Sequence, residues 1–166
     1  MSANKSTSVR AVCFDASALL KLYVEEDGSD RLRAFFYGEP TKYTTHLCFH
    51  EALTLLKVNW LYRNKLTTEQ YNSAVFDLVI WFRDSASRYP DLDFTSPLVL
   101  PEVQRIAGQY DLDISDAFQI LSVKDGYFQG LVDGSKTILA TADAKLAKAA
   151  KAEGIRVWNC LKEEAP

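Results

Sequence analysis

Short apolar segments with the composition of β-strands alternate with helical patterns along almost the whole chain. Residues 10–14 form an apolar, β-rich run that ends at Asp15, and apolar residues then recur at helical spacing over 18–23. Residues 42–45 and the apolar stripe over 47–61 repeat this unit. Because parallel strands need crossover connections, which helices supply, the alternation predicts an α/β fold whose parallel sheet is covered by helices on both faces.

The start of one helix is marked by local capping signals. Thr67 and Gln70 have the spacing of a capping box, and Leu66 and Tyr71 are placed to form a hydrophobic staple across it. The pattern predicts a helix that begins here and continues to about Asp84.

The same helix carries more apolar surface than one core contact requires. Phe76, Ile80 and Trp81 lie outside its main apolar stripe. We interpret the surplus as a partner surface, with a helix clamped inside a thicker core as the alternative.

The remaining elements follow from periodicity and from glycine stops. A weaker strand is expected at 91–95, strands at 136–141 and 155–158, and helices at 99–109, 115–124 and 144–153, closed in the last two cases by Gly126 and Gly154. A sheet of about four to five strands results. The stretch 125–135 is expected to extend a loop at the end of the sheet away from the acids discussed below.

The length fits a single domain spanning residues 1–166. A chain of 166 residues, 48% of them hydrophobic, is long enough for one well-buried core. We expect that core to cover about residues 9–160, with short flexible ends at 1–8 and 162–166.

Two features predict a cytoplasmic protein. The longest apolar runs, such as residues 74–82, fall well short of the roughly 18–20 residues that cross a bilayer, so no membrane association is expected. Cys13, Cys48 and Cys160 are odd in number, widely spaced and flanked by apolar residues, which indicates buried thiols in a reducing compartment.

The formal net charge of −3 argues against a protein that holds nucleic acid mainly by bulk electrostatics. A net value averages over the surface, however, so acids that bind cations can coexist with a local basic strip. Lys145, Lys148 and Lys151 form such a strip at three-residue spacing. A solvated helix face explains them more simply than phosphate contacts do.

Four acids occur where the carboxyl ends of parallel strands should lie. Asp15 and Asp143 follow strands, and Glu51 and Asp116 lie early in the helices that come after strands or loops at the same end. Converging carboxylates repel one another and raise each other's pKa unless a cation neutralises them. Oxygen ligands without paired histidines or thiolates favour Mg²⁺ or Mn²⁺, and the natural chemistry is phosphoryl transfer.

The local sequences around these acids resemble, in order, the four signature stretches of the PIN-domain family. They are Phe14-Asp-Ala-Ser-Ala-Leu-Leu-Lys-Leu-Tyr23, Cys48-Phe-His-Glu-Ala-Leu53, Leu112-Asp-Ile-Ser-Asp-Ala-Phe118 and Ile138-Leu-Ala-Thr-Ala-Asp-Ala-Lys-Leu146. The likeness is strongest to the VapC-like toxin ribonucleases of type II toxin-antitoxin systems, and it spans residues 9–158.

This resemblance implies a three-layer α/β/α fold and metal-dependent endonucleolytic cleavage of RNA. Asp15, Glu51, Asp116 and Asp143 would be the catalytic, metal-holding residues, with Mg²⁺ or Mn²⁺ as cofactor. Ser17 and Thr141 match small hydroxyl residues of the family that orient carboxylates or water. The family also implies a homodimer and, for toxins, a small antitoxin protein.

Alternatives remain at the level of residues. Asp113 also lies close to Asp116 and could share the metal role. Taken one at a time, Asp15, Asp116 and Asp143 fit helix caps or first-turn acids, which stabilise helices by about 0.5–2 kcal/mol. Glu51 fits that explanation less well, because apolar neighbours surround it.

Alternatives also remain at the level of function. A PIN-fold module that binds RNA or protein without catalysis is the main competitor, although it would be expected to lack at least one of the four acids. An aspartyl-phosphate phosphatase is a weaker one, because that chemistry usually places an acid two residues after the first, where this chain has Ser17.

Overall fold

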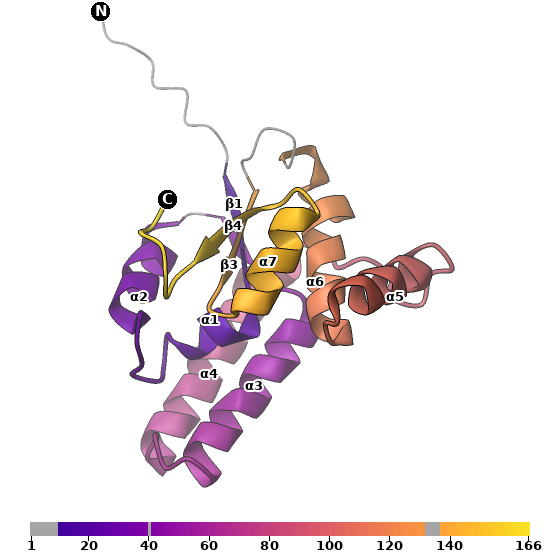
Figure 1. The fold of residues 1–166 in the computed structure, drawn as a ribbon. Helices are drawn as coiled ribbons and strands as arrows, with labels where there is room; N and C mark the ends of the chain where they lie inside the picture. The colour runs from indigo at the N-terminus through magenta and orange to yellow at the C-terminus, as the bar shows by residue number, and fades with distance from the viewer. Residues whose placement is uncertain (1–9, 40, 132–136) are drawn as a thin grey trace, which may run out of the picture.

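A four-stranded, entirely parallel sheet in the order β2-β1-β3-β4 lies at the centre of the computed structural model (Figure 1). The structure describes residues 10–39, 41–131 and 137–166. The strands are β1 (Ala11–Phe14), β2 (Lys42–Tyr43), β3 (Thr137–Thr141) and β4 (Arg156–Asn159). The helices are α1 (Ala16–Leu20), α2 (Ser29–Gly38), α3 (His46–Leu61), α4 (Thr68–Asp84), α5 (Val99–Tyr110), α6 (Ile114–Asp125) and α7 (Ala144–Ala152), with 3₁₀ turns η1 (Ala86–Arg88) and η2 (Gln129–Leu131).

The alternation of side chains along β1 explains the three layers. Val12 and Phe14 point into a core formed with α1 to α4, whereas Ala11 and Cys13 point into a second core formed with α5 to α7. Both faces of the strand are therefore fully buried. The predicted α/β/α fold with a central parallel sheet is confirmed.

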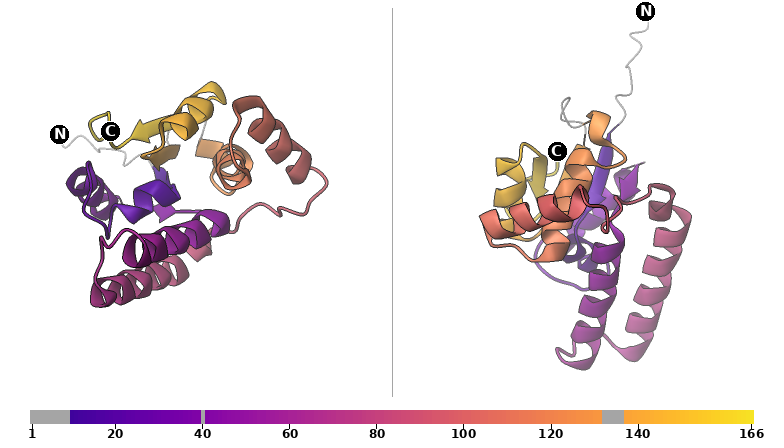
Figure 2. Two further views of the ribbon diagram at one scale, coloured as in Figure 1. Left: turned by 60° about the horizontal axis from the view of Figure 1, so that its bottom comes forward. Right: turned by 90° about the vertical axis from the view of Figure 1, so that its right-hand side faces the viewer.

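Helices α3 and α4 form an antiparallel hairpin that extends beyond the sheet (Figures 1 and 2). The predicted capping box is present, since the Thr67 hydroxyl accepts from Gln70 N at 3.1 Å and the Gln70 side chain accepts from Thr67 N at 2.9 Å. Of the surplus apolar residues, Phe76 is 65% exposed, but Trp81 is half-buried and packs edge-on against Phe36. Trp81 therefore serves the core, and Phe76 remains a surface residue.

Helix α2 was not recognised from the sequence. Its buried residues, Leu32, Phe35 and Phe36, are few and close together, so no extended helical stripe marks it. It is preceded by Gly28 at φ +82°, where an added Cβ would lie 2.9 Å from the Cys160 carbonyl oxygen. A non-glycine residue would be strained there both by conformation and by contact.

The strand expected at 91–95 is wrong, because side chains in this segment bond the neighbouring backbone instead of leaving it free for a sheet. The Asp93 carboxylate accepts from the backbone N and hydroxyl of Thr95 at 2.9 and 2.7 Å. The Asp91 carboxylate accepts from His46 N at 2.7 Å, across the entry to α3. The bonds between Asp93 and Thr95 are local and favour a turn over an extended strand.

The other predicted elements are confirmed within one or two residues, including the glycine stops after α6 and α7, except the first helix. That helix was expected over 18–23, but α1 spans Ala16–Leu20 and ends three residues earlier. The first part of the expected flexible C-terminal end is bonded to the fold. The Glu163 carbonyl accepts from Arg31 and from Trp158 Nε1, and its carboxylate accepts from Asn159 N. The expected flexible N-terminal end, residues 1–8, lies outside the described residues. So do residues 132–135, the last part of the expected 125–135 loop. Within the described ranges, the longest helices fall short of the length and apolarity that a bilayer crossing requires.

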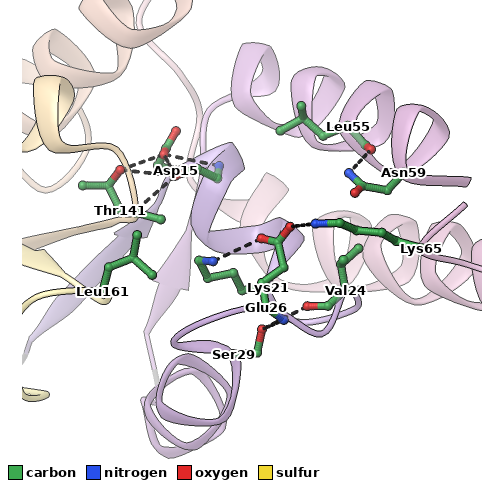
Figure 3. Close-up of polar contacts among 12 residues, drawn as sticks. Asp15, Lys21, Val24, Glu26, Ser29, Leu55, Asn59, Lys65, Thr141 and Leu161 are labelled. Atoms are coloured by element: carbon green, nitrogen blue, oxygen red, sulfur yellow. Dashed lines mark hydrogen bonds and ion pairs between the residues drawn. The ribbon is translucent and has the colours of Figure 1, made fainter. Parts of the chain in front are cut away.

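A buried lysine ties α1 to the α3–α4 hairpin (Figure 3). The Lys21 side chain is 6% exposed and donates to Glu26 at 3.1 Å, and Lys65, from the loop between α3 and α4, donates to the other Glu26 oxygen at 2.7 Å. Burial alone would raise the pKa of Glu26, but the bonds from Lys65 and Lys21 outweigh it and lower that pKa.

Replacing Glu26 should therefore destabilise the fold. Glu26→Gln leaves the Lys21 ammonium buried without a counter-charge, and we expect a loss of about 2–3 kcal/mol in the free energy of unfolding at pH 7. Urea denaturation measures the loss. The matched control is Glu25→Gln, whose 74% exposed side chain pairs with Arg33 at the surface and should contribute well under 1 kcal/mol. Equal effects of the two substitutions would contradict the account.

Candidate metal centre

Asp15 is placed by the end of β1 and the start of α1. Its backbone N donates to the Ala140 carbonyl of β3 at 3.0 Å, which continues the parallel ladder by one residue. Its side chain caps α1 by accepting from Ser17 N at 3.3 Å. The residue is 3% exposed, so a carboxylate is held at the very edge of the core.

Two hydroxyl groups bond one oxygen of the Asp15 carboxylate. Thr141 Oγ1 donates to Asp15 Oδ2 at 2.8 Å (Figure 3), and the Ser17 hydroxyl bonds the same oxygen. Ser17 Oγ in turn accepts from Ala142 N at 3.0 Å. Burial raises the pKa of Asp15, and the bonds from Ser17 and Thr141 oppose that rise. Ser17 and Thr141 thus have the orienting contacts that the sequence suggested.

Asp143 lies beside this pair, two residues beyond Thr141. Its backbone N donates to Thr141 Oγ1 at 2.9 Å. One of its carboxylate oxygens caps α7, accepting from Lys145 N and Leu146 N at 2.7 and 2.9 Å. The capping role of Asp143 is therefore real, and its side chain remains exposed to solvent.

The start of α6 brings three more polar side chains to the same end of the sheet. Asp113 is the N-cap of α6, because its carboxylate accepts from Asp116 N at 2.9 Å. Ser115 Oγ lies 2.8 Å from Glu51 Oε2 and 2.9 Å from Asp113 Oδ1, so it links α6 to α3. The Asp116 carboxylate makes no hydrogen bond or ion pair with any other described residue.

Burial and neighbouring carboxylates raise the pKa of Asp116 and of Glu51. Burial, followed by the charges of Asp15, Asp113, Glu51 and Asp143, raises the pKa of Asp116 to about 8. The pKa of Glu51 is also raised, by burial first and then by the same neighbouring acids, against a lowering bond from Ser115. All four predicted acids therefore form one electrostatically coupled group, to which Asp113 belongs as well.

The donor set suits a hard divalent cation without forming a complete cage. In the part of the chain that the structure describes, no three acidic, histidine or cysteine side chains are arranged as a ready-made metal site. Mg²⁺ is usually bound through one or two carboxylates and keeps several waters, so this arrangement is compatible with it. The unpartnered Asp116 and the buried Asp15 are the residues best suited to contact such an ion directly.

Sequence reasoning missed the part played by Ser115. Nothing in its local pattern shows that its hydroxyl bonds Glu51, which is 64 positions away. The signal available was its place between Asp113 and Asp116 in a segment already expected near the acids.

The basic strip on α7 is partly neutralised. Lys145 pairs with Asp111 at 2.6 Å and Lys151 with Glu163 at 2.7 Å. Among the three lysines, Lys148 alone makes no ion pair with a described residue, and it is exposed. A solvated helix face with surface ion pairs therefore explains Lys145 and Lys151.

Comparison with known proteins yields a structural likeness only. No family model matches the chain, and no curated protein matches it. A solved structure, that of PAE2754 from Pyrobaculum aerophilum, covers 93% of this chain and 88% of its own at 20% identity and a TM-score of 0.51. At this identity the likeness concerns the fold alone, and it supports the α/β/α arrangement described above.

The raised pKa of Asp116 predicts a pH-dependent effect of its removal. In the folded protein this carboxyl holds its proton up to about pH 8, whereas in the unfolded chain it ionises near its ordinary value of 3.8. Asp116 therefore costs stability that grows as the pH rises from about 4 to 8. Without divalent metal, Asp116→Asn should stabilise the protein by at least about 1 kcal/mol at pH 9, after allowance for solvent screening.

Thermal unfolding at pH 4, 6 and 9 in chelator measures this effect. The gain should be absent at pH 4 and largest at pH 9. Asp125→Asn, at the exposed far end of the same helix, is the matched control and should show no such trend. A pH-independent difference between wild type and Asp116→Asn would contradict a shifted carboxyl at this position.

Proposed function

We propose that this protein is a Mg²⁺- or Mn²⁺-dependent endoribonuclease that hydrolyses RNA phosphodiester bonds. The observation that carries the proposal is the Asp116 carboxylate, which is partly buried, unpartnered among the described residues and surrounded by the charges of four other acids. Helix capping explains Asp15, Asp113 and Asp143 in part, but it explains neither Asp116 nor Glu51.

The residues of the site would divide the work between holding and orienting. Asp15 and Asp116 would bind the ion, and Glu51 and Asp143 would hold its water ligands. Ser17 and Thr141 keep the Asp15 carboxylate in one orientation, and Ser115 does the same for Glu51. A bound divalent ion supplies Lewis acidity that activates water and stabilises charge on the phosphate oxygens.

Support for RNA as substrate, and for a toxin with a small antitoxin, comes from the resemblance of the four acidic stretches to VapC-like PIN domains. A homodimer and a cytoplasmic location belong to the same proposal. Buried Cys13, Cys48 and Cys160 are compatible with a reducing compartment. Phe76 and Val79, 65% and 39% exposed on α4, offer apolar surface to a protein partner.

Cleavage of RNA tests the enzymatic proposal. Purified protein should cut a mixed cellular RNA pool with Mg²⁺ or Mn²⁺ and not with chelator. Asp15→Asn and Asp116→Asn should each lower the rate at least about 100-fold, because each removes a ligand charge that the transition state depends on.

Asp125→Asn should cleave like wild type and controls for a general effect of neutralising an acid on α6. If the protein binds RNA but cuts none with either metal, the catalytically silent binding module becomes the preferred function. Equal activity of wild type and both site variants would place any cleavage elsewhere.

Metal binding itself should be visible in stability. At pH 7.5 a Mg²⁺ concentration of 100 times the dissociation constant should stabilise the wild type by about 2.7 kcal/mol, because the ion binds only the folded site. Differential scanning fluorimetry against Mg²⁺ concentration follows the shift. The unfolding temperature of Asp116→Asn should change little with Mg²⁺. If Mg²⁺ or Ca²⁺ stabilises wild type and Asp116→Asn equally, the ion does not bind at Asp116.

A further inference from the structure

A small hollow lies where the start of β2 meets the end of α4 and the η1 turn. It encloses about 160 Å³ and is lined by Lys42, Trp81, Ser85, Arg88 and Tyr89. Each of these side chains carries a hydrogen-bond donor, and none is acidic. A hollow lined in this way favours an anion rich in acceptor oxygens.

The two cations of the hollow have no carboxylate partner in the described structure. Lys42 Nζ stands 4.7 Å over the Phe36 ring, and the nearby Glu39 is bonded by Arg10. Arg88 feels the charge of Asp84, but both oxygens of Asp84 are bonded by Arg83, at 2.6 and 3.0 Å. Two positive charges therefore border the hollow while the neighbouring acids are otherwise engaged.

Trp81 lines the hollow and gives it a local spectroscopic reporter. Its indole Nε1 is buried from solvent and has no acceptor among the described residues, so its N–H resonance senses changes in the packing of this side chain. The other two tryptophans are satisfied, since Trp60 Nε1 donates to Thr68 Oγ1 at 3.3 Å and Trp158 Nε1 to the Glu163 carbonyl at 3.2 Å.

We propose that this hollow binds a phosphate group, with Arg88 and Lys42 neutralising its charge and the Ser85 and Tyr89 hydroxyls donating to its oxygens. A water occupies about 30 Å³ in the liquid, so 160 Å³ accommodates a phosphate with a few waters. Arginine forks match phosphate oxygens, and hydroxyl donors complete the set.

The hollow is distinct from the acidic group. Lys42 pairs with Val12, three residues before Asp15 on the neighbouring strand. At about 3.3 Å per residue, this places the level of Lys42 roughly 10 Å from Asp15 along the strands. The inference therefore does not rest on the proposed nuclease activity, although a phosphate of a bound RNA chain and a free phosphate are both sources of the same chemistry.

The indole N–H resonances give a direct test with built-in controls. In a ¹H–¹⁵N spectrum of the full chain, with chelator present, the Trp81 indole peak is assigned by its loss in Trp81→Phe. Titration with inorganic phosphate at constant ionic strength, kept with chloride, should move the Trp81 peak saturably while the Trp60 and Trp158 peaks stay in place. Arg88→Ala should raise the midpoint at least about tenfold, and Arg63→Ala, at an exposed arginine after α3, should not.

A second titration with a short RNA oligonucleotide, again in chelator so that no cleavage occurs, distinguishes the sources. Tighter binding of the RNA identifies a phosphate of an RNA chain, and tighter binding of inorganic phosphate identifies a free anion. The proposal is overturned if neither ligand moves the Trp81 peak, if all three indole peaks move together, or if Arg88→Ala leaves the midpoint unchanged.

Discussion

The parallel pairing of β1 with β3 is the interaction on which the rest of the structure depends. Its register sets Phe14 opposite Ala140, and the next residue continues the ladder through the bond from Asp15 N to the Ala140 carbonyl. Because both strands end at the same edge, Thr141 Oγ1 reaches the Asp15 carboxylate at 2.8 Å. Strand pairing and the geometry of the acidic group are therefore one feature, since a shift in register would break both.

The acids at this edge differ in how their charge is accommodated. Asp15 is buried, but two hydroxyl groups bond its carboxylate. Asp143 is exposed, and its carboxylate caps α7. Asp116 has neither kind of relief, so burial and its neighbours raise its pKa to about 8. A fold that retains such a carboxylate gives up stability at one point, which is typical of functional sites, where strained or unfavourable groups concentrate.

Strong local signals and the consequences of parallel topology could be predicted from the sequence, whereas weak local signals and individual contacts between distant residues could not. The capping box at Thr67 and the strand that leads into Asp15 depend on neighbouring residues and are confirmed. Helix α2 lacks an extended stripe, and the 91–95 segment is held in turns by its own side chains. Of the site, the shared location of the acids followed from parallel topology, whereas the bond from Ser115 to Glu51 required the packing of α6 against α3.

Anomalous diffraction from crystals soaked in Mn²⁺ shows whether the coupled carboxylates bind a divalent cation. A bound ion should give an anomalous peak within coordination distance of the Asp116 and Asp15 carboxylates, roughly 2.0–2.2 Å from the nearest oxygen, with further ligands from water. The peak should be lost in crystals of Asp116→Asn. An empty map at these carboxylates under saturating Mn²⁺, or a peak that persists without Asp116, would exclude a cation bound by this carboxylate.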